Sequence, residues 1–170
     1  MEFATLEDKV NYLLDRAEIT DVINAYCYGM DTRDWDLYRS CWVEEIALDF
    51  TELELYDEPM PTIKADHWVR ALAAFFAEMP QSQHVKYPSR WEFDGDRATV
   101  MSIMQGKHWM PTSTGGPIQT VVGYYRDELV RTEEGWKLCG LKELVHWNEG
   151  NSHVLDSNLV RLLKILKEGA

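Results

Sequence analysis

Apolar residues at helical spacing open the chain and return near its middle. From residue 6 to residue 31 they recur every three or four positions, and Asp31 stands at the end of this pattern. Asp34 is placed to cap a short second helix. A third helix is expected over residues 64–79, before Pro80. The three stripes that should pack are Leu6, Val10, Leu13, Leu14, Ala17, Val22 and Ala25; Leu37, Tyr38, Cys41 and Trp42; and Trp68, Ala71, Leu72, Phe75 and Phe76.

Alternation of apolar and polar residues then predicts strands. A first strand contains Ile46, Leu48 and Phe50. After Pro80, four long strands are expected with hardly any helical signal between them. They span residues 82–93, 97–110, 118–131 and 136–147. Hairpin turns at 94–96 and 132–135 and a longer link at 111–117 join them, which makes consecutive strands antiparallel.

The order of these elements indicates the α+β class, because helices are followed by a run of strands. We expect a single domain over residues 1–170, since this length suffices for one sizeable core. The predicted shape is a cone, in which a curved antiparallel β-sheet is closed on its concave side by the helices. Residues 52–62 read as an acidic, proline-containing loop. A C-terminal helix over residues 157–168 is capped by Asp156 or Ser157.

The composition of the chain excludes several classes of partner and cofactor. The formal net charge of −12 repels phosphate backbones and anionic membrane surfaces, so we expect no nucleic-acid or membrane partner. Three cysteines without paired spacing read as reduced thiols, and the N-terminus lacks an apolar signal core, so a cytoplasmic protein is expected. Seven Trp and eight Tyr fill a core or line a pocket for a flat ligand. Because no nucleotide-binding motif is present, no cofactor is expected.

Two histidines fall on one face of the predicted sheet. His108 shares the more apolar face of its strand, where a buried imidazole needs a partner. The alternative is a core histidine that a backbone carbonyl satisfies. In an antiparallel pair joined at residues 94–96, residue 84 falls roughly opposite residue 106, so His84 and His108 would be diagonal neighbours on one face.

Asp31 gives this pair a chemical use. On its own it reads as a helix-end residue that accepts local hydrogen bonds. Beside the two histidines, it can hold one imidazole in a fixed orientation and leave the other ring nitrogen free to take a proton. Burial lowers the pKa of a histidine and a nearby carboxylate raises it, so we expect one neutral and one protonated ring. No His pair has metal-ligand spacing, and no metal site is expected.

Several segments resemble the scytalone dehydratases of fungal melanin biosynthesis, within the larger SnoaL-like and nuclear-transport-factor-2-like (NTF2-like) superfamily. The resemblance spans roughly residues 26–149. It implies a cone-shaped α+β barrel, a cofactor-free lyase activity, trimers built through the sheet, and catalytic roles for Asp31, His84 and His108. The segments that carry it are residues 30–36 (MDTRDWD), Gln83-His84, Arg90-Trp91-Glu92, residues 136–142 (WKLCGLK), Trp147 and Glu149.

The chain differs from that family at the positions that bind the ketone group of the substrate. Two family tyrosines align with Met30 and Phe50, and a serine and an asparagine fall near Gly123 and Tyr125. We therefore expect a larger or less polar cyclic substrate than scytalone. The residues expected to line its cavity are Tyr28, Met30, Phe50 and Tyr125, of which Tyr28 shares the helix face of Asp31.

The leading hypothesis is a cofactor-independent dehydratase acting on a cyclic polyketide-like or terpenoid hydroxy-ketone. His84, oriented by Asp31, removes the proton next to the carbonyl, and His108 protonates the departing hydroxyl. An isomerase or cyclase that uses the same groups without loss of water is the second reading, and a non-catalytic small-molecule binding module is the third. A homo-oligomer is expected, with a trimer favoured and a dimer left open.

Overall fold

The computed structural model describes residues 3–53, 59–60, 62–112 and 114–168. Its elements follow the expected order of helices first and strands second. They are α1 (Leu6–Thr32), α2 (Trp35–Ser40), β1 (Trp42–Asp49), the short 3₁₀ helix η1 (Thr51–Leu53), β2 (Ile63–Lys64), α3 (Ala65–Phe76), β3 (Gln81–Asp94), β4 (Arg97–Trp109), β5 (Ile118–Thr132), β6 (Gly135–Gly150) and α4 (His153–Glu168).

In the described part of the chain, six strands form one sheet in the order β2-β1-β6-β5-β4-β3. The four long strands are antiparallel neighbours, as predicted, and their bounds lie close to those expected. However, β1 pairs with β6 in parallel, so the sheet is mixed and not purely antiparallel. Alternation of side chains identifies a strand but does not give its direction, and no hairpin joins β1 to β6.

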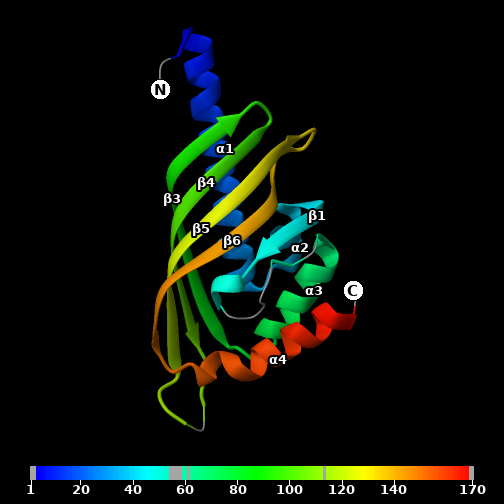
Figure 1. Ribbon diagram of the computed structural model, residues 1–170, viewed down its shortest axis with the longest axis vertical. Coiled ribbons are helices and arrows are strands. Elements are labelled where there is room, and N and C mark those ends of the chain that lie inside the picture. The colour runs from blue at the N-terminus through cyan, green and yellow to red at the C-terminus, as the bar shows by residue number, and fades with distance from the viewer. Residues whose placement is uncertain (1–2, 54–58, 61, 113, 169–170) are drawn as a thin grey trace.

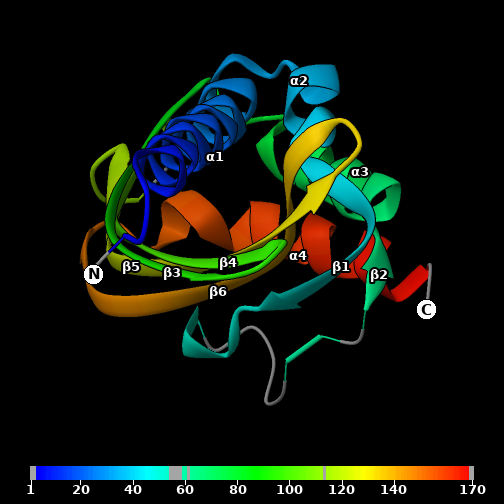
Figure 2. The same ribbon diagram turned by 90° about the horizontal axis from the view of Figure 1, so that it is seen from above.

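The sheet is curved and open, and helices cover its concave side (Figure 2). Helix α1 runs along the long axis across the long strands, while α4 crosses the lower end of the molecule next to α3 (Figure 1). The cone-shaped α+β architecture is thus confirmed. Strands β3 and β5 begin, and β4 and β6 end, at the edge where α4 lies, because Ser82 pairs with His108 and Gln119 pairs with Gly150.

The core lies between α1, α3 and the concave face of the sheet. Fully buried side chains of α1 and of the strands meet there, and the expected inward face of β4, from Ala98 to His108 at every second residue, is buried throughout. The largest fully buried side chains are Trp42, Trp136, Tyr38, Ile19, Ile23, Ile46, Leu48 and Met104. Burial of such side chains is the main favourable term in folding.

Three sequence-based details need correction. The first half of the α1 stripe, from Leu6 to Leu14, is exposed, because α1 is about 40 Å long and its N-terminal part projects beyond the sheet (Figure 1). Trp42 begins β1 and does not continue the α2 stripe. Helix α4 begins at His153, four residues before the predicted start, because the side chain of Asn151 accepts a hydrogen bond from the backbone N–H of His153 at 3.2 Å.

The predicted loop over residues 52–62 is described only in part, since residues 54–58 and 61 lie outside the described residues. At its start, residues 51–53 form η1, so this end is regular and not a loop. At its far side, Met60 donates a backbone hydrogen bond to Leu48 O at 3.0 Å, which holds it against β1. Among the helices of the described residues, none is both long enough and apolar enough to cross a membrane.

Candidate functional site

The end of α1 is fixed to the start of β3 by Arg33. Arg33 adopts a left-handed backbone conformation with φ of 63°, which stops the helix just after Asp31. Its guanidinium donates hydrogen bonds to Met30 O at 2.5 Å, to Met79 O at 3.1 Å and to Ser82 Oγ at 2.8 Å. The guanidinium also lies 4.4 Å from the ring centre of Phe76. Asp31 is therefore held at a defined place beside the first residues of β3.

Asp31 binds His84 through both of its carboxylate oxygens. Oδ1 lies 2.7 Å from Nδ1 of His84 and accepts a second hydrogen bond from Ser82 Oγ at 2.8 Å. Oδ2 accepts the backbone N–H of His84 at 2.6 Å. Since a carboxylate accepts, Nδ1 of His84 carries the hydrogen and Nε2 is left free.

These contacts set the charge of Asp31. Burial acts to raise the pKa of this carboxyl group, but the hydrogen bonds and charge interaction with His84, together with the hydrogen bond from Ser82, outweigh burial. The pKa of Asp31 therefore lies below its ordinary value, and the group is a carboxylate at neutral pH. A carboxylate in this position stabilises the imidazolium form of its partner ring.

The rings of His84 and His108 lie edge to face, with their centres 5.1 Å apart. His84 pairs with Gly106 in the sheet, as the sequence predicted, and His108 follows two residues later on the same face. Phe76 of α3 packs against both rings, at 5.9 Å from His84 and 6.3 Å from His108. Both histidines are buried, so the structure brings together Asp31, His84 and His108 on the concave side of the sheet.

His108 has a different partner from His84. Its Nδ1 lies 3.0 Å from Oε1 of Gln119, a side chain on the neighbouring strand β5. The backbone-carbonyl alternative therefore does not hold for this nitrogen. The pKa of His108 is lowered to about 3, mainly by burial and also by the nearby His84, while the hydrogen bond with Gln119 and the charge of Asp31 act in the opposite direction. His108 is therefore neutral at neutral pH.

Of the four residues expected to line the substrate cavity, three are buried. Met30 is inside at the end of α1, Phe50 stacks on Trp68 with ring centres 5.4 Å apart, and Tyr125 donates its hydroxyl to Glu143 at 2.9 Å. Tyr28 lies on the outer side of α1 and is 63% exposed. Its hydroxyl is therefore not among the interior groups of this chain.

Sequence reasoning missed a buried polar cluster deeper on the concave face. Nζ of Lys86 lies 2.5 Å from Oδ1 of Asp127 and 4.4 Å from the ring centres of both Tyr26 and Tyr125. Ser102 donates to the other oxygen of Asp127 at 3.2 Å. Burial also raises the pKa of Glu143 to about 7. Strand alternation could have indicated Lys86, because Lys86 is two residues from His84 and therefore lies on the same face of the strand.

One surface depression reaches the Asp31–His84 pair, and a second is lined by Gln119, the partner of His108. One of about 620 Å³ lies between α1 and the edge strand β3, and it opens the Asp31–His84 pair to solvent. A second of about 420 Å³ lies between the ends of β5 and β6 and the first turns of α4, with Gln119 in its wall. The residues of the first are Asn24, Cys27, Tyr28, Asp31, Pro80, Gln81, Ser82, Gln83 and His84, and those of the second are Gln119, Val121, Asn148, Glu149, Gly150, Ser152, Leu155, Asp156 and Leu159.

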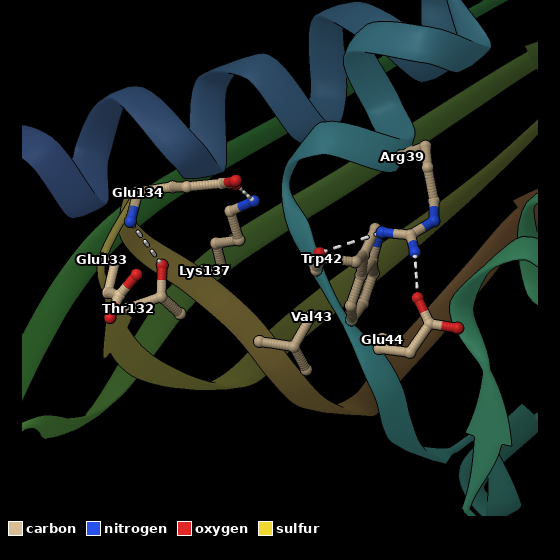
Figure 3. A pocket seen from close by; sticks show the side chains of 8 residues that line it. All are labelled: Arg39, Trp42, Val43, Glu44, Thr132, Glu133, Glu134 and Lys137. Atoms are coloured by element: carbon tan, nitrogen blue, oxygen red, sulfur yellow. Dashed lines mark hydrogen bonds and ion pairs between the residues drawn. The ribbon is translucent and has the colours of Figure 1, made fainter.

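A third depression, of about 430 Å³, lies away from the histidines, between the start of β1 and the β5–β6 turn (Figure 3). Four of its five charged groups pair with each other: Arg39 with Glu44 at 2.8 Å, and Lys137 with Glu134. The eight residues that line it include none of the sequence-predicted site residues. We therefore place the candidate site at the Asp31–His84–His108 group.

Comparisons with known proteins agree with this architecture. A scytalone dehydratase of Colletotrichum orbiculare is 24% identical over 125 residues, which cover 70% of this chain and 66% of that protein, slightly less than two thirds of its length. A solved protein structure from Kribbella flavida shares 29% identity and a TM-score of 0.79, covering 85% of this chain and 99% of the other.

A third similar protein, a hexachlorocyclohexane dehydrochlorinase from Novosphingobium barchaimii, has the same fold at 17% identity. Its TM-score is 0.67, with coverage of 85% of this chain and 94% of the other. The family model of the SnoaL-like domain matches residues 11–142, which is more than half of the chain. The chain belongs to the SnoaL-like domain family, within the NTF2-like superfamily.

Proposed function

We propose that this protein is a cofactor-independent lyase that removes water from a hydrophobic, cyclic hydroxy-ketone. The observation that carries the proposal is the Asp31–His84 pair, in which a carboxylate holds a buried imidazole by Nδ1 at 2.7 Å and leaves Nε2 free. Such a pair is an oriented general base. The similarity to a scytalone dehydratase and to a dehydrochlorinase supports an elimination reaction.

The proposed reaction uses one base that later acts as the acid. Nε2 of His84 takes the proton from the carbon next to the carbonyl, and the electron pair of that C–H bond forms the new C=C bond. The C–O bond to the leaving hydroxyl breaks, and the oxygen departs with its electron pair. The His84 imidazolium, stabilised by Asp31, returns its proton to this oxygen, so that water leaves and His84 is neutral again.

This assignment changes the role that the sequence suggested for His108. With a pKa of about 3, His108 is not an imidazolium at neutral pH and cannot act as the general acid, so its neutral ring serves as a hydrogen-bond partner for the substrate. The buried Met30, Phe50 and Tyr125 supply a largely apolar surround, consistent with a cyclic substrate of low polarity.

The experiment that tests the function is a panel of cyclic β-hydroxy-ketones incubated with the intact protein. Mass spectrometry then shows whether a product lacks one water. We expect His84→Gln to abolish turnover and to keep the circular dichroism spectrum. His146→Gln is the matched control, because His146 is exposed on β6. A His84→Gln variant with undiminished activity rules out this mechanism.

One observation also favours an isomerase as the second function. Because only one of the two rings is set up to exchange a proton, His84 can return that proton to another carbon of the substrate instead of to oxygen. Such a reaction moves the double bond without loss of mass. The same mass measurement therefore separates the two functions.

We also propose that the chain assembles through the outer face of the sheet, as a trimer in preference to a dimer. Four large apolar side chains on this face are about half exposed or more: Val85, Tyr87, Ile103 and Trp147. Contiguous apolar surface of this kind marks interaction sites. Sedimentation equilibrium measures the state directly, and we expect Tyr87→Glu to dissociate it. A monomeric wild-type protein at micromolar concentration contradicts the proposal.

A further inference from the structure

Gln119 is the direct neighbour of His108 in the sheet. The two residues are paired across β4 and β5, and both are buried, with 6% of His108 and 4% of Gln119 exposed. Their side chains meet at 3.0 Å between Nδ1 of His108 and Oε1 of Gln119. Because the contact is made by a side chain of the adjacent strand, it is set by the register of the sheet.

The other end of the Gln119 amide is also engaged. Nε2 of Gln119 donates a hydrogen bond to Oδ1 of Asn148 on β6, at 3.2 Å. The amide therefore turns its N–H group toward Asn148 and its oxygen toward His108. Since an amide oxygen only accepts, Nδ1 of His108 carries the hydrogen, and the lone pair of the neutral ring is on Nε2.

The two histidines thus have partners of different charge. His84 is held by a carboxylate, whereas His108 is held by an uncharged amide. The charged or titratable groups that face His108 are His84 on β3 and Asp31 and Arg33 at the end of α1. From α3 it meets the uncharged ring of Phe76. Because the Gln119 partner is uncharged, burial is the largest influence on the pKa of His108.

We propose that Gln119 is a positioning residue that fixes His108 as the neutral imidazole protonated on Nδ1, so that Nε2 of His108 accepts a hydrogen bond from the leaving hydroxyl of the substrate. The hydroxyl keeps its own hydrogen, which it donates as a hydrogen bond to Nε2 of His108, and it receives the second hydrogen of water from the His84 imidazolium. The site consequently selects a leaving group that carries a hydrogen, such as a hydroxyl, over an alkoxy group or a halide. This catalytic part rests on the proposed lyase function, but the ring state does not.

The ring state is measured without any substrate. The intact protein is labelled with [¹⁵N]histidine, and long-range ¹H–¹⁵N spectra are recorded between about pH 5 and about pH 8, a range over which an unperturbed histidine titrates. His108 is assigned by the loss of its signals in His108→Gln. We expect a protonated Nδ1 and an unprotonated Nε2 that do not change over this range.

Variants of Gln119 separate positioning from simple space filling. Gln119→Glu brings a carboxylate to the ring and should raise the pKa of His108 by about 1 to 3 units. Gln119→Leu removes the acceptor, so the ring should lose its preference for the Nδ1–H form. The matched control is Gln105→Leu, an exposed glutamine on β4, which should leave the His108 signals unchanged.

A ring protonated on Nε2, an imidazolium at about pH 6, or a Gln119→Glu variant whose titration, followed down to about pH 3, matches that of wild type would each overturn the assignment. The kinetic arm compares a cyclic β-hydroxy-ketone with its methyl ether. Wild type should prefer the hydroxy compound, and Gln119→Leu should reduce that preference about tenfold through kcat/KM. Absence of turnover of every compound, with the expected spectra, overturns the lyase function and the catalytic part alone, and leaves the ring state established.

Discussion

The carboxylate of Asp31 accepts two hydrogen bonds from the same residue, one from the backbone N–H of His84 at 2.6 Å and one from its ring Nδ1 at 2.7 Å. The first fixes the start of β3 against the end of α1, and the second fixes the ring relative to that backbone. The orientation of the proposed base is therefore built into the fold, which would lower the cost of reaching a reactive geometry.

Asp31→Asn should abolish most of the activity without unfolding the protein. The asparagine amide has one accepting oxygen in place of two, so it cannot hold both the ring and the backbone N–H of His84, and the ring loses its fixed tautomer. We expect kcat to fall about 10³- to 10⁴-fold. Initial rates and circular dichroism check this. Asp21→Asn, an exposed aspartate on the same helix, is the control and should keep full activity. An Asp31→Asn enzyme with near-normal kcat contradicts the role of the pair.

Gly106→Ala should disturb the active site more than the fold. A Cβ atom at residue 106 would lie 3.1 Å from Cδ2 and 3.3 Å from Nε2 of His84, and 3.5 Å from Cε1 of His108. The His84 ring must therefore shift, and a displaced catalytic group costs about tenfold to a hundredfold in rate. Gly116→Ala is a suitable comparison, since a Cβ there meets nothing within 4 Å. Equal kcat values for the two variants would contradict the expectation.

Lys86→Met should destabilise the protein strongly. Both side chains of the Lys86–Asp127 pair are fully buried, and removal of the lysine leaves an unpaired carboxylate in the interior. We expect a loss of about 3–5 kcal/mol in the free energy of unfolding, measured by urea denaturation. The double variant Lys86→Met with Asp127→Leu removes both charges and should recover most of that loss. If the double variant is no more stable than the single one, the loss does not come from the unpaired charge.

Glu143→Gln should stabilise the protein at alkaline pH alone. Burial raises the pKa of Glu143 from 4.5 to about 7, so its favourable contribution is complete below its unfolded pKa and is lost as pH rises through the folded value. Glutamine still accepts the Tyr125 hydroxyl but carries no charge. The variant should exceed wild type by up to about 3 kcal/mol at about pH 8.5 and match it at about pH 4.5. Urea denaturation at both values tests this, with the exposed Glu149→Gln as control.

Much of this site was predictable, because it depends on strand alternation and one hairpin. The turn at residues 94–96 sets the register next to it, with Asp94 opposite Arg97. A bulge between Pro88 and Arg90 then shifts the pairing by one residue, which places His84 opposite Gly106 and on the face of His108. The Gln119 contact depends on the longer link at residues 111–117, whose length does not define a register. The Lys86–Asp127 pair joins β3 and β5, which are not neighbours in the sheet. Alternation predicts that each side chain points inward, but it does not predict that the two contact each other.

Other features were out of reach for physical reasons. The direction of β1 is set by its packing beside β6, and no local signal records it. The exposure of Leu6 to Leu14 reflects where the sheet ends relative to α1, which periodicity does not contain. Tyr28 lies one turn before Asp31 and lines the same depression, but it is 63% exposed, because helical spacing gives the side of a helix and not what packs over it.

The guanidinium of Arg33 joins three backbone regions that are distant in sequence, namely the end of α1, the segment after α3 and the beginning of β3. The contacts with Met79 and Ser82 cannot form while the chain is only locally ordered, since these residues must first be brought to Arg33. Competence to react is thus a property of the completed tertiary structure. In a refolding reaction, recovery of turnover should follow the slowest docking step and lag behind the recovery of helix content.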